Sequence, residues 1–272
     1  MTDTLTDAEF EQFRSIIYSE SGITFSETNR SILESRIKEL IREKSVASVN
    51  DYYKLVTTNS DEMKYMLDAV TTNLTRFFRN QAHFDALEHF VIPNILKEKE
   101  KVGNTKIRVW SAGCSTGEEP YTIAMLLKSI LPAPYTFAIT ASDLSLKSLM
   151  TAKLGYYAAS KVTGIPDSYL AKYLTKSTDG YQMNKEIMDT IHFDYHNLKH
   201  AITERNFDIV FCRNVLIYFD EPAQRAVINN FYEAMAPHSY LFIGHSESLF
   251  GMDTKFEFVK TEQTTLYQKN EP

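Results

Sequence analysis

The segment from Arg108 to Pro120, RVWSAGCSTGEEP, constrains the fold of this chain more than any other. An apolar stretch typical of a strand leads into a loop of small residues and then into the start of a helix. Glycine in such a loop lets the backbone approach a ligand closely, with amide N–H groups and the positive end of the helix dipole facing it. The segment therefore predicts a strand, a loop and a helix that hold a small ligand between them.

Strands and helices alternate in the remainder of the chain. We expect strands at residues 107–111, 136–141, 190–195, 207–212 and 240–244, and helices at 118–131, 145–154 and 221–236. Near-continuous apolar strands separated by helices are typical of a parallel sheet that is covered on both faces. Two short strands near the end, 256–259 and 264–267, predict an antiparallel hairpin, because only a short polar link joins them.

The first eighty residues predict helices with no strand between them. Apolar residues recur at helical spacing in four segments, and each segment follows a residue that can cap a helix. The expected caps are Thr6, Ser26, Ser48 and Ser60, with a capping box at residues 6–9. Gly22 is expected to end the first helix. Four short amphipathic helices predict a small bundle.

The chain is thus predicted to have three parts. Residues 1–72 form a helical domain, residues 73–105 a linker and a leading helix, and residues 106–272 an α/β domain with a small, irregular excursion at about 155–189. The leading helix contains Pro93, which predicts a kink or a break, because proline lacks the amide hydrogen that a helix interior needs.

Composition excludes several classes of protein. A chain of 272 residues with 43% hydrophobic and 24% charged residues is globular, and its net charge of −6 argues against nucleic acid as the main partner. No apolar run approaches the ~18 residues of a membrane span. The N-terminal residues have no signal-peptide pattern, and the two cysteines, Cys114 and Cys212, have neither a pairing nor a metal-type spacing. We expect a cytoplasmic protein with reduced thiols and no membrane insertion.

The glycine loop itself favours a ligand without phosphates. It reads Gly113-x-x-x-Gly117, with Ser115 where a dinucleotide-binding fingerprint has its middle glycine. Glu118 and Glu119 at the helix start would repel a phosphate but would attract an ammonium group. An ordinary strand-to-helix turn is the alternative interpretation. If the loop binds a ligand, an adenosyl compound such as S-adenosylmethionine (SAM) fits it best.

Polar residues follow the ends of the neighbouring strands. Asp143 ends the second strand, where it either accepts hydrogen bonds from ribose hydroxyls or caps the helix that begins near Ser145. Because ligands of open α/β sheets lie at the carboxyl ends of the strands, Arg213, Asn214 and Tyr218 are expected to face whatever lies over the cofactor.

Five motifs together resemble those of the CheR-type chemoreceptor glutamate methyltransferases. They are TTNLTRFFR at 71–79, the loop at 113–121, ASD at 141–143, FCRNVLIYFD at 211–220 and GHSES at 244–248. The resemblance spans nearly the whole chain. It implies a Rossmann-like SAM-dependent methyltransferase sheet, mostly parallel with an antiparallel C-terminal hairpin, preceded by a small all-α domain.

The resemblance also implies an activity and a set of site residues. The family uses SAM to methylate glutamate side-chain carboxyls in the cytoplasmic helices of methyl-accepting chemoreceptors, giving a glutamyl 5-O-methyl ester and S-adenosylhomocysteine (SAH). Arg79 and Tyr218 match the residues at the methyl-transfer centre. The positions that match cofactor-binding residues are Asn73, Thr75, Arg79, Gly113, one or both of Glu118 and Glu119, Asp143, Asn197, Leu198, Asn214 and Val215.

Two other functions remain open at this stage. One is SAM-dependent methylation of another protein or of a small molecule, and the other is a non-catalytic SAM-binding module that regulates a partner. No general base is expected for the leading function, because a glutamate with a pKa of about 4.3 is already ionised at neutral pH. Arg79 is expected to orient the substrate through one oxygen, and Tyr218 to donate a hydrogen bond or to form a wall of the site.

Binding partners are less clearly indicated. The second helix carries the basic residues Arg30, Arg36, Lys38, Arg42 and Lys44, which either dock an acidic receptor helix or form a solvated face with the interleaved glutamates. The resemblance also implies that the excursion could bind a receptor C-terminal peptide, as in some family members, but the short turn at 177–180 argues against such binding here. The chain is expected to be a monomer.

Three histidines have a spacing that resembles a metal site. His192, His196 and His200 recur at every fourth residue, but apolar residues alternate with polar ones from 191 to 195. This alternation predicts a strand followed by a loop, from which the three rings diverge. We therefore expect no metal.

Overall fold

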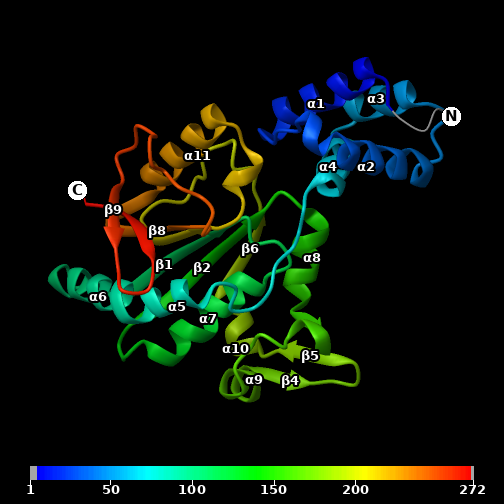
Figure 1. Ribbon diagram of the computed structural model, residues 1–272. Coiled ribbons are helices and arrows are strands. Elements are labelled where there is room, and N and C mark those ends of the chain that lie inside the picture. The colour runs from blue at the N-terminus through cyan, green and yellow to red at the C-terminus, as the bar shows by residue number, and fades with distance from the viewer. Residues whose placement is uncertain (1–4, 271–272) are drawn as a thin grey trace.

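The computed structural model describes residues 5–270, which form a helical domain and an α/β domain joined by an extended segment, residues 71–80, which we call the strap (Figure 1). Residues 1–4, part of the segment in which the sequence predicts no export signal, lie outside the described residues. The helical domain consists of α1 (Asp7–Ser21), a 3₁₀ turn (Glu27–Asn29), α2 (Arg30–Glu43), α3 (Val49–Thr58) and α4 (Ser60–Val70). The predicted bundle of four helices is confirmed, and its apolar faces form one core around Phe10, Phe13 and Leu33.

The capping residues explain where these helices begin and end. Thr6 and Glu9 form the predicted capping box of α1, and Gly22 ends that helix in the left-handed conformation, with φ of 77°. Ser48 caps α3 as predicted. Ser26 precedes the 3₁₀ turn, so that α2 itself begins only at Arg30.

The predicted cap of α4 is wrong by one residue. The cap is Asn59, whose side-chain oxygen accepts hydrogen bonds from the N–H groups of Asp61 and Glu62 at 3.0 and 3.3 Å. Ser60 is therefore the first residue of the helix. Asparagine and serine are equally good caps, so the sequence alone did not distinguish them.

The leading helix is interrupted just before Pro93. It consists of α5 (Gln81–Ala86), a π-helical turn (Leu87–Val91) and α6 (Ile92–Lys101). The N–H of Ile92 donates to the carbonyl of Leu87, five residues back. This wide turn is the predicted break. It lies just before Pro93, which lacks the N–H group that the regular α-helical hydrogen-bond pattern would need.

The main sheet of the described chain has seven strands in the order β6-β2-β1-β7-β8-β10-β9. They are β1 (Lys106–Ala112), β2 (Thr136–Asp143), β6 (Ile191–Tyr195), β7 (Phe207–Cys212), β8 (Met235–Ile243), β9 (Glu257–Lys260) and β10 (Thr265–Lys269). Strands β6, β2, β1, β7 and β8 are parallel, whereas β10 runs antiparallel to both β8 and β9. The predicted fold class, including the terminal hairpin, is confirmed.

The sheet positions a ligand site because the strand order reverses at β1. The chain passes from β1 to β2 and β6 on one side, and then crosses to β7 and β8 on the other. Helices α7 (Glu118–Ile130), α8 (Leu146–Leu154) and α11 (Glu221–Ala234) connect the strands. The connections that follow β1 and β7 leave in opposite directions at this switch point, which in open α/β sheets is where ligands bind. Figure 1 shows the strap from the helical domain passing this edge.

The excursion is more regular than the sequence indicates. It contains β3 (Tyr156–Ala158), β4 (Leu174–Lys176) and β5 (Gly180–Met183), which form a second, antiparallel sheet, together with α9 (Asp167–Tyr173), α10 (Lys185–Met188) and a 3₁₀ turn (Ala159–Lys161). Strands of three or four residues are too short to show a periodicity of two, so the sequence pattern missed them. Tyr157 of β3 packs edge-on against Phe77 of the strap at 4.9 Å between ring centroids, which fixes the strap from below.

Candidate active site

A cavity of about 260 Å³ lies at the carboxyl ends of β1, β2 and β7, beneath the strap and the end of α1. Both domains line it. Most residues that the resemblance assigns to the cofactor or to methyl transfer lie on its wall, namely Asn73, Thr75, Arg79, Gly113, Glu119, Asp143, Asn197, Leu198, Asn214, Val215 and Tyr218. The fold thus brings together residues that are up to 145 positions apart in the chain (218 − 73).

The glycine loop uses its amides within the protein. The N–H groups of Gly113 and Cys114 donate to the carbonyl of Ser142 at 2.8 and 2.9 Å, and the N–H of Ser115 donates to Asp143 at 2.7 Å. Gly113 has a φ of +80°, and a Cβ there would lie 2.5 Å from Cγ2 of Val215. Because these three N–H groups already have acceptors, the loop suits a ligand that brings no phosphate.

Asp143 links this loop to the next helix. One carboxylate oxygen accepts from Ser115, and the other accepts from the N–H of Ser145 at 2.8 Å. The cap of α8 is Ser145, which accepts from the N–H of Ser148, so Asp143 does not have the alternative capping role. Burial raises the pKa of Asp143, while the backbone N–H groups of Ser145, Ser115 and Leu144 act against this rise. Each carboxylate oxygen retains a second lone pair, as ribose binding requires.

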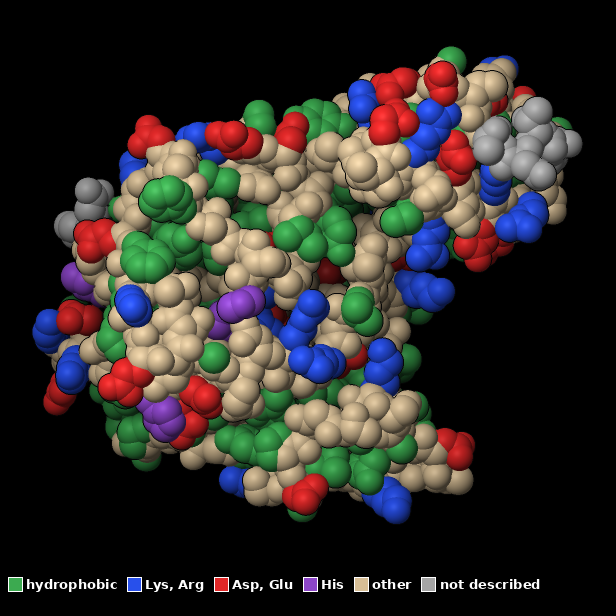
Figure 2. All heavy atoms as spheres, in the orientation of Figure 1, with side chains coloured by type: hydrophobic (Ala, Val, Ile, Leu, Met, Phe, Trp, Pro, Cys, Tyr) green, Lys and Arg blue, Asp and Glu red, His purple; other side chains and the backbone are tan. Residues whose placement is uncertain are grey.

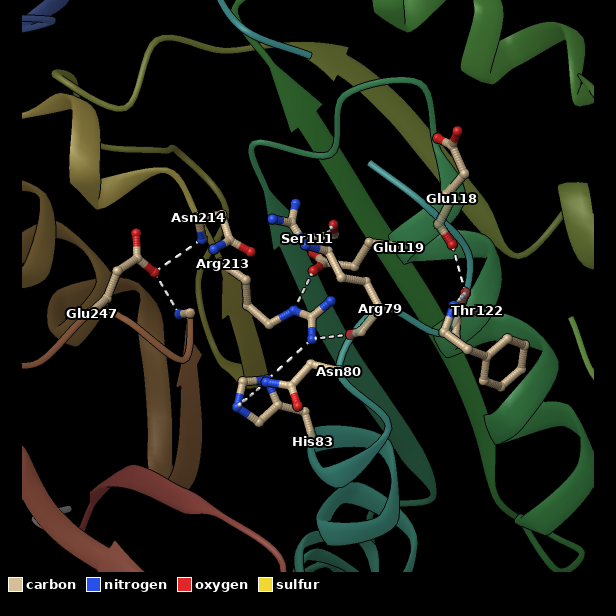
Figure 3. Close-up of polar contacts among 12 residues, drawn as sticks. Arg79, Asn80, His83, Ser111, Glu118, Glu119, Thr122, Arg213, Asn214 and Glu247 are labelled. Atoms are coloured by element: carbon tan, nitrogen blue, oxygen red, sulfur yellow. Dashed lines mark hydrogen bonds and ion pairs between the residues drawn. The ribbon is translucent and has the colours of Figure 1, made fainter. Parts of the chain in front are cut away.

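The two glutamates at the start of α7 differ in direction (Figure 3). Glu119 lines the cavity, where one oxygen accepts from the Ser111 hydroxyl and the other from Nε of Arg213, each at 2.7 Å. Glu118 is buried away from the cavity lining, and it accepts from the hydroxyl of Thr116 at 2.6 Å. The geometry therefore favours Glu119 as the member of the pair that meets the cofactor.

Arg213 is the centre of this network. Its guanidinium is buried, and besides Glu119 it donates to the backbone carbonyl of Arg79 at 2.7 Å and to Nδ1 of His83 at 3.1 Å. Burial and the neighbouring Arg213 charge lower the pKa of His83 to about 3. The imidazole is therefore neutral and accepts the Arg213 hydrogen bond. One side chain thus joins β7, α7, the strap and α5 (Figure 3).

Glu247 is a site residue that sequence reasoning did not assign. Its carboxylate accepts from the N–H groups of Gly244 at 2.5 Å, Asn214 at 2.9 Å and Ile217 at 3.2 Å. These contacts hold the turn that carries Asn214 and Tyr218. The GHSES motif was the available signal, but only the fold shows that its glutamate reaches the loop after β7.

The two residues expected at the methyl-transfer centre both line the cavity and come from different segments of the chain. Arg79 belongs to the strap, and its Nη1 donates to the carbonyl of Leu74 at 2.9 Å. Tyr218 ends a 3₁₀ turn, and its carbonyl accepts from the N–H of Thr24 at 2.8 Å. Asn197 extends the contact between the domains by donating to the carbonyl of Glu20 at 2.7 Å. The helical domain thus closes one wall of the site.

The cavity also contains polar atoms that lack a protein partner. Within residues 5–270, the hydroxyl of Thr24 and Nε2 of His196 are buried without a hydrogen bond, and both residues line the cavity. His196 and His200 line a second pocket together, whereas His192, on β6, does not line it. Residues 5–270 contain no group of three or more histidine, cysteine or acidic side chains that could hold a metal.

Comparison with known protein families shows the family to which the chain belongs. Residues 73–265 match the family model described as "CheR methyltransferase, SAM binding domain", and residues 8–71 match "CheR methyltransferase, all-alpha domain". The chain belongs to the CheR methyltransferase family. As a CheR methyltransferase it is a SAM-dependent enzyme of chemotaxis, and the cavity residues described above fit the SAM cofactor.

Curated relatives resemble this CheR methyltransferase over nearly their full length. The chemotaxis protein methyltransferase of Borreliella burgdorferi is 33% identical, with 98% of this chain and 95% of that protein covered. Chemotaxis protein methyltransferase 2 of Vibrio cholerae is 32% identical over 97% and 94% of the two chains. The Escherichia coli chemotaxis protein methyltransferase is 31% identical over 93% and 88%. In the part of the chain that the structure describes, no helix has both the length and the apolarity for crossing a membrane.

His83 is predicted to make stability fall on mild acidification. Its pKa is lower in the folded protein than its usual value of about 6.5, so the unfolded state binds more protons between pH 6.5 and pH 3. From pH 7 to pH 5 this linkage removes about 2 kcal/mol from the free energy of unfolding. Urea unfolding at pH 7 and pH 5 should show that His83→Gln loses less free energy of unfolding than the wild type on acidification. His89→Gln, at an exposed histidine of the same leading helix, is the control and should lose as much as the wild type. Equal losses in all three proteins would contradict the prediction.

Glu247 is predicted to support cofactor binding through the loop that it holds. In Glu247→Gln one carboxylate oxygen is replaced by an NH₂ group, which cannot accept from the backbone N–H groups that it faces. The loop that carries Asn214 is therefore held less firmly. We expect SAH to bind about tenfold more weakly by calorimetry, corresponding to a loss of ~1.4 kcal/mol, just below the range for a hydrogen bond to a charged group. Glu262→Gln, in the exposed β9–β10 turn, is the matched control. Unchanged SAH affinity in Glu247→Gln would refute this role.

Proposed function

We propose that this CheR methyltransferase methylates glutamate side chains in the helical cytoplasmic segments of chemoreceptors, giving the 5-O-methyl ester and SAH, and that it does so as a cytoplasmic monomer. The family membership supports methyl transfer in chemotaxis. The observation that carries the residue-level proposal is that Arg79 and Tyr218 line the same cavity as the glycine loop and Asp143. A cation and a phenol at the mouth suit an incoming carboxylate.

The cavity lining supports the residues that the resemblance assigns to the cofactor. Asp143 would accept hydrogen bonds from the ribose, and Glu119 lies where it can meet the methionine ammonium. Asn197 and Leu198 from one loop, and Asn214 and Val215 from the other, line the rest of the wall. When bound, SAM supplies an electrophilic methyl group on a positively charged sulfur.

The protein's own contribution is positioning and exclusion of water. The substrate glutamate, with an ordinary pKa of about 4.3, is ionised at neutral pH, so no side chain must remove a proton. Correct placement of two reactants can account for roughly 7–11 kcal/mol of a barrier. Because positive and negative charge are neutralised in the transfer, a water-poor cavity also favours it.

Arg79 is suited to orient the substrate without binding it too tightly. Nη1 of Arg79 donates to the carbonyl of Leu74, which helps to fix the guanidinium while its other N–H groups remain for a carboxylate. A bidentate clamp would stabilise the charged ground state more than the less charged transition state. Contact with one carboxylate oxygen leaves the other free to attack.

The basic face of α2 contributes less to docking than its sequence indicates. Arg30 forms ion pairs with Asp7 at 2.8 Å and Glu34 at 2.9 Å, and Lys44 pairs with Glu62 at 2.8 Å. These two cations therefore stabilise the helical domain itself. Docking of an acidic receptor helix on this face remains part of the proposal through the more exposed Arg36, whose contact with Glu39 is 4.0 Å.

A labelling experiment tests the proposed function and separates it from the alternatives. The protein is incubated with methyl-labelled SAM and candidate receptor cytoplasmic fragments, and the product is treated with mild alkali. Volatile methanol indicates a carboxyl ester, as we expect. Alkali-stable label indicates methylation of another atom, and absence of label with intact SAH binding supports a non-catalytic module; either result would overturn the proposal.

Tyr218 is predicted to act as a hydrogen-bond donor or wall rather than as a general base. Tyr218→Phe should lower the single-turnover rate by about 10- to 100-fold if the hydroxyl donates a hydrogen bond worth ~1–3 kcal/mol, and should leave it nearly unchanged if the ring only forms a wall. A loss beyond ~10⁴-fold, the upper end for general acid–base catalysis, would show that Tyr218 moves a proton. Tyr156→Phe, at an exposed tyrosine of the excursion, is the matched control and should retain the wild-type rate.

A further inference from the structure

Three aliphatic side chains lie exposed at the mouth of the cavity. Ile32 of α2 is 52% exposed, Leu74 of the strap 76% and Ile217 of the 3₁₀ turn 52%, yet all three residues line the cavity. Single exposed aliphatic residues are common on protein surfaces. Three of them, from separate segments and around one opening, form an apolar patch of the kind that marks a binding surface. We call these three residues the apolar ring.

The fold does not use the apolar ring for its own stability. Each segment buries a neighbouring residue instead: α2 buries Leu33, the strap buries Phe77 and the 3₁₀ turn buries Leu216. The ring side chains point away from these cores. Their exposure is therefore a cost to the free protein that binding of an apolar surface would remove.

The backbone of the ring is held by groups of the active site. The carbonyl of Leu74 accepts from Arg79, and the N–H of Ile217 donates to Glu247 at 3.2 Å. The same Glu247 carboxylate holds Asn214. Two of the three ring residues are thus fixed relative to the residues that face the cofactor and the substrate carboxylate.

The charges near the ring favour an acidic partner. Arg79 lies at the mouth, and Arg76 is exposed on the same strap. Within the cavity, Glu119 is paired with Arg213 at 2.7 Å, and so does not strongly oppose an incoming anion. Figure 2 shows hydrophobic and basic side chains gathered around the hollow between the two domains, with acidic atoms at its floor.

We propose that the apolar ring is the docking surface for the residues that flank the methyl-accepting glutamate. Its occupant is an amphipathic helical segment in which apolar side chains lie three or four positions from the glutamate on the same face. The glutamate enters the cavity toward Arg79 while its apolar neighbours cover Ile32, Leu74 and Ile217. This inference rests on the proposed function and adds a rule for substrate choice.

Substitutions in the ring test the proposal through the separation of KM from kcat. Leu74→Ser and Ile217→Ser should each raise the KM for a receptor fragment about fivefold to tenfold, and the double variant more. The kcat and the SAH dissociation constant should stay within about twofold of wild type, because neither the chemistry nor the cofactor contacts change. Val102→Ser and Leu154→Ser, at residues 74% and 69% exposed on other surfaces, control for loss of an exposed aliphatic side chain.

A reciprocal substitution in the substrate makes the test specific. A receptor fragment whose apolar residues flanking the acceptor glutamate are changed to serine should show a raised KM with the wild-type enzyme, and little further increase with Leu74→Ser. Such non-additivity identifies residues that contact each other. Additive increases would show that the ring and these substrate residues do not meet, and would overturn the inference.

The outcomes distinguish the two proposals. If wild-type protein methylates the fragment but the ring variants keep its KM, the apolar ring is not a docking surface and the proposed function stands. If the ring variants bind SAH more weakly and also show a raised KM, the ring belongs to the cofactor site and the inference is overturned. If sedimentation shows a wild-type dimer that Leu74→Ser dissociates without a KM change, the ring binds a second copy instead. If wild-type protein labels no fragment, both proposals fail.

Discussion

The buried ion pair between Arg213 and Glu119 is the interaction on which the site depends. Two charges removed from water are tolerated only when both are paired and their remaining hydrogen-bonding groups are satisfied. Arg213 meets this condition by adding the carbonyl of Arg79 and the ring of His83 to its contact with Glu119 at 2.7 Å. The start of α7, the strap and α5 are therefore fixed relative to β7, because loss of any one contact leaves a buried charge undercompensated.

A second set of contacts builds the rim of the cavity on this fixed base. Asp143 holds the glycine loop and Glu247 holds the loop after β7, each by accepting backbone N–H groups. In both cases a carboxylate positions a loop rather than forming an ion pair. The helical domain completes the wall through the carbonyl of Glu20 and the N–H of Thr24. Two domains thus share one site that neither could form alone.

The sequence predicted the parts of this protein that depend on long, local patterns. The helices of the bundle and the strands of the main sheet extend over enough residues for periodicity and caps to identify them. It missed the excursion sheet, whose strands are three or four residues long, and it misplaced the cap of α4 because Asn59 and Ser60 are equivalent on propensity. The family resemblance named the site residues, but it did not distinguish Glu118 from Glu119. That distinction depends on which side chain Arg213 reaches, which is a property of the packed structure. Glu247 was missed for the same reason, since its partners lie 30 and 33 residues away along the chain.

The engaged amides of the 113–115 loop also determine which adenosine compounds the cleft can admit. ATP and SAM present the same purine and the same sugar, and differ in the group attached to the 5′ carbon. A triphosphate would require N–H donors that here already bind the Ser142 carbonyl and the Asp143 carboxylate, and it would lie beside acidic side chains. At these three positions the loop therefore offers a phosphate chain no free backbone donor, whereas the 5′ substituent of SAM needs none there.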